Sequence, residues 1–235
     1  MLFYSDYNDP GNGSSYGGME VRNNIFYGAA GYTLVVSAAS GGKIDIHHSS
    51  LKLDGNLYRF GGKGIAWYPR QFNCQIDGAD GAAEFAAFQT ANAPDVQDAR
   101  GKRTTAAKSA VFANASARDY QLVAGSPAID AGVELTTTRS VGSDTTTIPV
   151  VRASFFQDGY GGLVAPDQVQ VGSNPPVSIV SVDDANNRIV VAQPISFPAG
   201  APVNLPYSGA GPDAGAFEFA AGIPAPSLLS VDPVP

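Results

Sequence analysis

The charged residues whose types could do chemistry gather between residues 43 and 70. A basic side chain with a lowered pKa can abstract a proton when neighbouring charges stabilise the product. On this reasoning the candidate catalytic residues are Lys43, His47, Lys63 and Arg70. The alternative interpretation is that they are outward-facing polar residues on the solvated surface of a β protein. For any single one of them we favour that alternative.

Aromatic residues in the same region suit carbohydrate binding. A sugar ring has an apolar face that stacks on an aromatic side chain, and its hydroxyl groups form hydrogen bonds with Asp, Asn and Arg. The predicted ligand-binding residues are Trp67, Tyr68, Tyr58, Arg59, Arg70 and Asp45. The alternative is that these aromatic side chains pack inside the protein. The segment from Phe155 to Tyr160 has the same two interpretations, and there we favour core packing.

The sequence predicts no metal site and no cofactor. His47 and His48 are adjacent, and adjacent residues on a strand point to opposite faces, so the pair does not readily chelate one ion. Calcium stays open because the chain is acidic, but calcium needs several oxygen ligands and no dense carboxylate cluster indicates a site. The lone Cys74 excludes an intramolecular disulfide. No P-loop, dinucleotide fingerprint or zinc spacing is present.

The composition indicates a turn-rich all-β protein. The 27 Gly and 17 Pro make up about a fifth of the 235 residues, and only 15% are charged. The net charge of −7 argues against nucleic acid as a partner, because such binding needs clustered Lys and Arg. No apolar run approaches membrane-spanning length. The residues after Met1 lack the features of a signal peptide. We therefore expect that further sequence precedes Met1, and that the chain is part of a larger, extracellular multidomain protein.

Local patterns predict many short strands and one helix. Residues 19–25 and 44–50 align at a spacing of 25, which suits one turn of a three-stranded solenoid. The stretch 81–91 is typical of a short helix, with Phe85 and Phe88 on one face. Two alternating apolar runs, 177–182 and 188–192, predict a hairpin around a turn-forming loop.

Two phrases in the chain resemble a known signature. DYQLVAGSPAIDAG at residues 119–132 and GPDAGAFE at residues 211–218 resemble the closing signature of right-handed parallel β-helix proteins, the pectate-lyase-like superfamily. DGNLY at residues 54–58 resembles a phrase of the last coils in that superfamily. The resemblance implies C-terminal coils of a right-handed parallel β-helix, with an inserted small antiparallel β-barrel or sandwich subdomain. It also implies that Asp130, Asp213 and Glu218 satisfy backbone amides where the coil ends.

This interpretation divides the chain into four parts. Residues 1–134 are predicted to form parallel β-helix coils, and residues 135–208 the inserted β-rich subdomain. Residues 209–222 return to the β-helix cap, and residues 223–235 form a Pro-rich linker or tail.

Three classes of function fit these predictions. We favour an extracellular carbohydrate-binding module that recognises a polysaccharide, because the coil region is short for the long groove of a lyase. The second class is the C-terminal part of a polysaccharide lyase or glycoside hydrolase. The third is a structural or adhesive component of a fibre or tail. The predicted fold serves all three, so assigning function from it is analogy.

Overall fold

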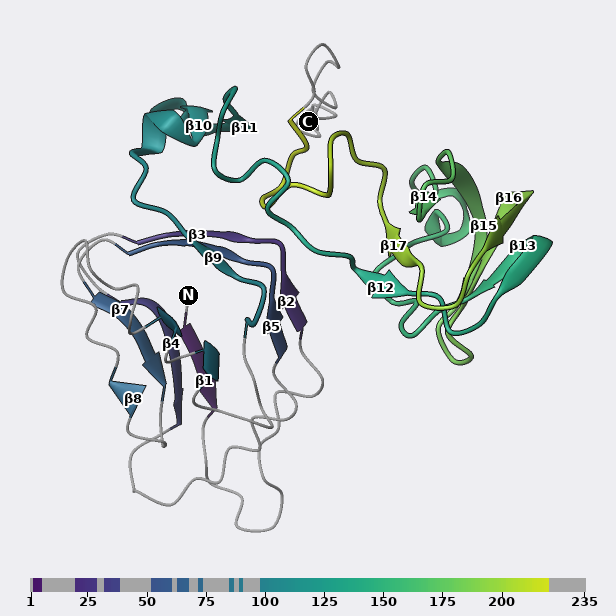
Figure 1. Cartoon of the computed structure of the whole chain (residues 1–235), viewed down its shortest axis with the longest axis horizontal. Helices are drawn as coiled ribbons and strands as arrows, with labels where there is room; N and C mark the ends of the chain where they lie inside the picture. The colour runs from purple at the N-terminus through teal and green to yellow at the C-terminus, as the bar shows by residue number, and fades with distance from the viewer. Residues whose placement is uncertain are drawn as a thin grey trace, which may run out of the picture.

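The structure is a computed structural model that describes residues 2–5, 20–28, 32–38, 52–60, 63–67, 72–73, 85–86, 89–90 and 98–219. Within these ranges the chain is predominantly β (Figure 1). The first strands are β1 (Leu2–Ser5), β2 (Glu20–Arg22), β3 (Ile25–Tyr27), β4 (Tyr32–Ala38), β5 (Lys52–Asp54), β6 (Leu57–Arg59), β7 (Lys63–Trp67), β8 (Phe72–Asn73) and β9 (Lys102–Arg103). They are followed by η3 (Lys108–Ala110), β10 (Phe112–Asn114), η4 (Ala115–Ala117), β11 (Asp119–Leu122), β12 (Thr136–Thr137) and β13 (Gly142–Pro149). The last elements are η5 (Tyr160–Gly162), β14 (Gln168–Val171), β15 (Val177–Asp183), β16 (Arg188–Phe197) and β17 (Pro202–Asn204).

Strands β1 to β9 pair mostly in parallel, in small sheets. Their orders are β1-β4-β7-β8, β2-β5 and β3-β6-β9, and only β7 with β8 is antiparallel. Glu20 pairs with Lys52, and hydrogen bonds join Arg22 to Asp54 and Asn24 to Asn56, each pair 32 residues apart. The predicted 25-residue repeat is therefore wrong, because the strand partner of 20–22 is 52–54.

The bends between these strands depend on residues that tolerate left-handed backbone. Asn23 has φ 56° between β2 and β3, and Gly55 has φ 67° between β5 and β6. Only glycine adopts such angles without steric cost, with asparagine the next best. A Cβ on Gly55 would also lie 2.6 Å from a methyl group of Val133. The bend thus requires glycine for its backbone angle and for space.

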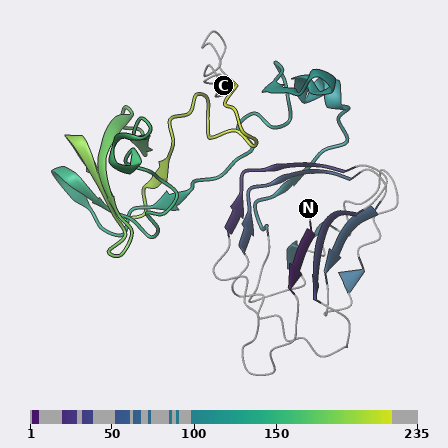
Figure 2. The ribbon, with the colours of Figure 1, turned by 180° about the vertical axis from the view of Figure 1, so that it is seen from behind.

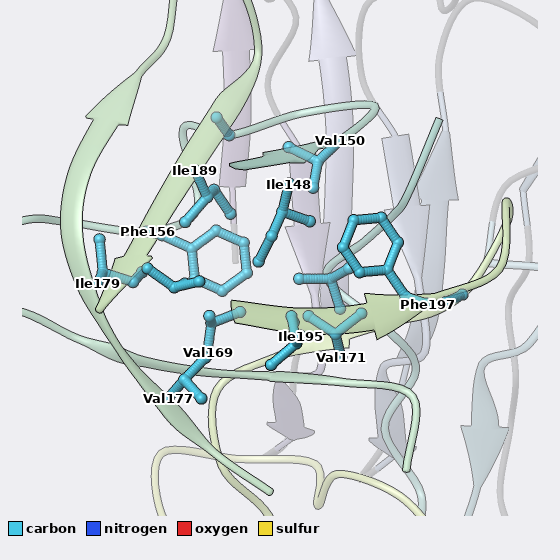
Figure 3. Close-up of a cluster of buried hydrophobic side chains, with 14 residues drawn as sticks. Ile148, Val150, Phe156, Val169, Val171, Val177, Ile179, Ile189, Ile195 and Phe197 are labelled. Atoms are coloured by element: carbon cyan, nitrogen blue, oxygen red, sulfur yellow. The ribbon is translucent and has the colours of Figure 1, made fainter. Parts of the chain in front are cut away.

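The largest sheet is antiparallel and lies in the second half of the chain. Its order is β12-β17-β14-β15-β16-β13, six strands in all. Buried and exposed residues alternate along β14 and the first part of β15, as expected when one sheet face packs on a core. Figure 3 shows Phe156 and Phe197 among the aliphatic side chains of this core. The predicted hairpin around residues 183–187 is confirmed, because β15 pairs antiparallel with β16.

The predicted right-handed parallel β-helix is wrong. The described chain is dominated by the six-stranded antiparallel sheet, which curls into a half-barrel, and its parallel strands form only small sheets. The resemblance was carried by short turn-rich phrases, and such phrases fix local bends rather than the pairing of distant strands. No observation tests the four-part division of the chain, which stays a prediction.

The two signature phrases lie side by side, although about eighty residues separate them. Gly132 N–H donates to the Pro212 carbonyl at 2.8 Å, and Ala214 N–H donates to the Ala128 carbonyl at 2.9 Å. Figures 1 and 2 show these segments running between the parallel strands and the antiparallel sheet. The segment that leads into the antiparallel sheet and the segment that follows the sheet therefore lie next to each other.

Candidate functional site

Most of the predicted site residues lie outside the described part of the chain. These are Lys43, Asp45, His47, Tyr68 and Arg70. Lys63 and Trp67 are the first and last residues of β7, but their side chains are also outside the description. Tyr58 and Arg59 are described in full. Apart from that of Tyr58, the roles predicted for these residues stay predictions.

Tyr58 is fully buried, with its ring among other aromatic side chains. The ring centroid lies 5.1 Å from that of Phe26, 5.7 Å from Phe60 and 5.3 Å from Phe85. Its hydroxyl donates to Oδ2 of Asp98. Burial and the Asp98 carboxylate raise the pKa of Tyr58 well above its ordinary value. Because protein atoms surround the ring, Tyr58 supports the strands and offers no face to a sugar.

Arg59 belongs to a cluster of cationic and aromatic side chains. It ends β6 and lies directly opposite Tyr27, the last residue of β3. The Arg59 guanidinium carbon is 5.3 Å from the centroid of the Tyr27 ring, and Nζ of Lys108 is also 5.3 Å from that centroid. Tyr27 donates its hydroxyl hydrogen to the Ala106 carbonyl at 3.0 Å, which fixes the ring. Cation–π contacts of this kind hold a cation in place without neutralising it.

A hollow of about 400 Å³ adjoins this cluster. Lys108 and Phe112 line it, and the ring of Tyr120 packs edge-on against Phe112 with centroids 5.4 Å apart. Tyr120 is 48% exposed, so part of its side chain is open to a ligand. The polar residues of the hollow are Ser109, Asn114 and Ser116. We call Tyr27, Arg59, Lys108, Phe112 and Tyr120 the basic–aromatic patch.

The patch contrasts with the charge of the whole chain. The protein has a net charge of −7, yet among the described residues no carboxylate forms a salt bridge with Arg59 or Lys108. A guanidinium presents several donors in a fixed plane, which suits carboxylates and vicinal hydroxyl groups. The arrangement can therefore bind a polar or anionic ligand beside exposed aromatic surface.

The sequence predicted Arg59 but missed Tyr27 and Lys108. The signal for Tyr27 was present, because aligning residues 20–28 with 52–60 places Tyr27 opposite Arg59. Lys108 reaches the patch through η3, which follows β9 in the chain. No local pattern in the sequence places that turn over the end of β3.

Asp54, another polar residue of the predicted region, belongs to a different charged network. Arg100 binds both oxygens of Asp54 and both oxygens of Glu134. The bond to Asp54 raises the pKa of Arg100 above its ordinary value. Arg22 also contacts Asp54, at 3.4 Å. Because its carboxylate is engaged by two guanidinium groups, Asp54 is structural here.

Carboxylates of Asp130 and Asp213 connect the two signature phrases, and that of Glu218 binds within the second phrase. Oδ1 of Asp130 accepts hydrogen bonds from Ala210 N–H at 2.8 Å and Gly211 N–H at 3.0 Å. Asp213 accepts from Asp130 N–H at 2.8 Å, and Glu218 accepts from Asp213 N–H at 2.9 Å. The prediction that these acids satisfy backbone amides is confirmed. Burial raises the pKa of Glu218 to about 7.

Metal and membrane features were also sought in the described ranges. No group of three or more His, Cys, Asp or Glu side chains there is placed to hold a metal ion. No helix in the same part of the chain is long and apolar enough to cross a membrane. Comparison of the chain with protein-family models, with curated proteins and with solved structures finds no match.

Proposed function

We propose that this protein binds a polysaccharide, and that the basic–aromatic patch is its contact surface. The observation that carries the proposal is the position of Arg59 and Lys108, each 5.3 Å from the Tyr27 ring, together with a hollow of about 400 Å³ that Lys108 lines. Fixed cations next to a hollow with hydroxyl and amide side chains can bind the hydroxyl or carboxylate groups of a sugar chain.

The exposed aromatic side chain supports the same proposal. A pyranose presents an apolar face, and Tyr120 is a half-exposed ring that packs against Phe112, a residue that lines the hollow. Tyrosine gives a large contact area for little loss of conformational entropy. Stacking on Tyr120 and polar bonds to Arg59 and Lys108 would then act on adjacent parts of one glycan. With a polysaccharide as ligand, we also propose that the protein acts outside the cell, as part of a larger multidomain protein.

The test is affinity electrophoresis and calorimetry of the full chain against a panel of neutral and acidic polysaccharides. The variant R59Q/K108Q removes both cations, and we expect it to lower affinity at least about tenfold, or roughly 1.4 kcal/mol. The matched control is Arg188→Gln, an exposed arginine at the start of β16, and it should bind like the unmodified protein.

Two results would overturn the proposal. One is full retention of binding by the R59Q/K108Q variant, which would place the ligand elsewhere. The other is no binding to any polysaccharide of the panel. Each mixture is also assayed for new reducing ends and unsaturated uronate ends. Their appearance would replace a pure binding function with a lyase or hydrolase.

A further inference from the structure

The antiparallel sheet and the parallel strands have separate apolar cores. Ile148, Val169 and Val203 belong to the core of the sheet, whereas Leu57 and Val111 belong to the core of the other part. The two clusters share no residue. Figures 1 and 2 show the two parts beside each other, joined by the segment that leads into β12 and the segment that follows β17. Each part can therefore keep its core when the other part moves.

The segment that leads into the sheet is anchored on both sides of one residue, Glu134. Val133 is buried, and its backbone N–H donates to Oδ1 of Asn23 at 2.8 Å, on the side of the parallel strands. Leu135 packs against the core of the sheet, and its N–H donates to Oδ1 of Asn204 at 2.8 Å. The change from one part to the other thus falls at Glu134.

The return segment changes parts a few residues after β17. Tyr207 N–H donates to Oε1 of Gln170 in the sheet at 3.4 Å, whereas Ala210 N–H donates to Asp130 at 2.8 Å. Gly209, just before Ala210, has φ 102°, an angle that favours glycine. Hinges are usually a few loop residues that can change their backbone angles. The residues between Tyr207 and Ala210 have that position.

Away from these two segments, the sheet contacts β2 through charged side chains and one ring. Nη1 of Arg152, which follows β13, contacts Oε1 of Glu20 at 2.5 Å. Arg22, also in β2, binds the other oxygen of Glu20 at 3.0 Å. The guanidinium carbons of Arg152 and Arg22 lie 5.7 Å and 5.9 Å from the centroid of the Phe155 ring. One carboxylate of the parallel strands is therefore shared by an arginine from each part.

Glu20 is the group on which this contact depends. Its side chain is 8% exposed, and Nζ of Lys52 lies 3.9 Å from its Oε1 as a third cation. Removing one partner of a buried ion pair leaves the other charges uncompensated, which costs more than losing an exposed pair. Without the charge of Glu20, Arg22 and Arg152 would repel each other.

We propose that the antiparallel sheet turns as a unit about Glu134 and residues 208–209, and that Glu20 latches it against β2 in the observed orientation. The latch fixes the sheet relative to the basic–aromatic patch, because Tyr27 and Arg59 of the patch belong to the parallel strands. Loss of the Glu20 contact frees the sheet to turn while both apolar cores persist. This motion is independent of whether the patch binds a polysaccharide.

The distance between two spin labels in the full chain tests the latch. The labels are attached at Thr105→Cys, after β9, and Ser178→Cys, in β15, two exposed positions in different parts, with Cys74→Ser to remove the native thiol. Pulsed electron paramagnetic resonance should give one narrow distance distribution for this labelled protein. Glu20→Gln and Arg152→Gln should each broaden the distribution, whereas Arg152→Lys, which keeps the charge, should leave it narrow.

Asp184→Asn is the matched control, because it removes an exposed carboxylate of the sheet that belongs to neither hinge nor latch. Circular dichroism checks that each variant is folded. The side chain of Arg152 is 38% exposed, so Arg152→Gln tests the latch even if Glu20→Gln unfolds the protein. The proposal is overturned if the folded Gln variants keep the narrow distribution, or if Arg152→Lys broadens it as much as Arg152→Gln does. A broad distribution in the labelled protein before any change to the latch also overturns it.

Discussion

At the scale of single residues, Asp98 carries a buried carboxylate that needs several hydrogen-bond donors. It accepts hydrogen bonds from the Tyr58 hydroxyl, the Asn56 side-chain amide and the Asn56 backbone N–H. Burial still raises the pKa of Asp98 to about 6. A buried charge is costly unless donors surround it, so each of these donors contributes to stability.

We therefore predict that Tyr58→Phe, which removes one donor and keeps the ring, lowers the free energy of unfolding by about 1–3 kcal/mol. Urea denaturation at pH 8, where Asp98 is ionised, measures the change. Tyr120→Phe is the matched control, because Tyr120 is 48% exposed, and it should change stability by less than about 0.5 kcal/mol. Equal losses in the two variants would show that the Tyr58 hydroxyl has no special role.

At the scale of elements, the bend between β5 and β6 is set by Gly55. Its φ of 67° and the 2.6 Å approach to Val133 both exclude a Cβ atom. We predict that Gly55→Ala lowers the free energy of unfolding by about 2–4 kcal/mol, from left-handed backbone strain plus overpacking.

Gly172→Ala separates the two causes. Gly172 has φ 56° but no atom within 4 Å of its would-be Cβ, so this variant should cost only about 1–2 kcal/mol. Thermal and chemical denaturation of both variants give the comparison. A Gly55→Ala loss no larger than that of Gly172→Ala would show that the space beside Val133 does not matter.

The strand pairings also show which parts of the fold the sequence could predict. The hairpin of β15 and β16 follows from alternation around a turn, since both signals are local. The 32-residue partner of β2 was missed, although Val21, Asn24 and Ile25 correspond to Leu53, Asn56 and Leu57. A spacing of 25 residues suits one solenoid turn, but the strand partner of β2 lies 32 residues away. Parallel pairing is non-local, so short strands carry little information about their partners.

The candidate site was only partly predictable for the same reason. Arg59 was identified by residue type, and its partner across the strands is Tyr27. Lys108 comes from a different element, and its position over the Tyr27 ring depends on the path of the chain after β9. Tyr58, predicted to bind ligand, is buried, and so is its neighbour Leu57, which points to the opposite face of β6; both faces of this strand are therefore covered, which residue type alone does not reveal.

At the scale of the whole molecule, charged contacts join the parallel strands to the antiparallel sheet. Arg152 contacts Glu20 of β2 at 2.5 Å, and Arg22 of β2 donates to the Glu134 carbonyl at 3.2 Å. On the return path, Glu218 accepts from Asp213 N–H through one oxygen, while its buried Oε2 has no partner in the described structure. Protonation of Glu218 would remove a poorly compensated charge from this junction.

This arrangement predicts that stability falls as pH rises through the weakly acidic range. Burial, with repulsion from Asp213 and Asp130, raises the pKa of Glu218 from 4.5 to about 7, so the folded protein binds this proton more tightly than the unfolded chain does. The stabilisation is complete below pH 4.5 and is lost as pH approaches 7. Asp98 acts in the same direction between pH 3.8 and about 6. We expect the free energy of unfolding, measured with urea at several pH values, to decrease over this range.

Glu218→Gln should remove the decrease between about pH 6 and 7, whereas the exposed control Asp184→Asn should keep it. A Glu218→Gln profile that parallels the unmodified protein would exclude Glu218 as the titrating group.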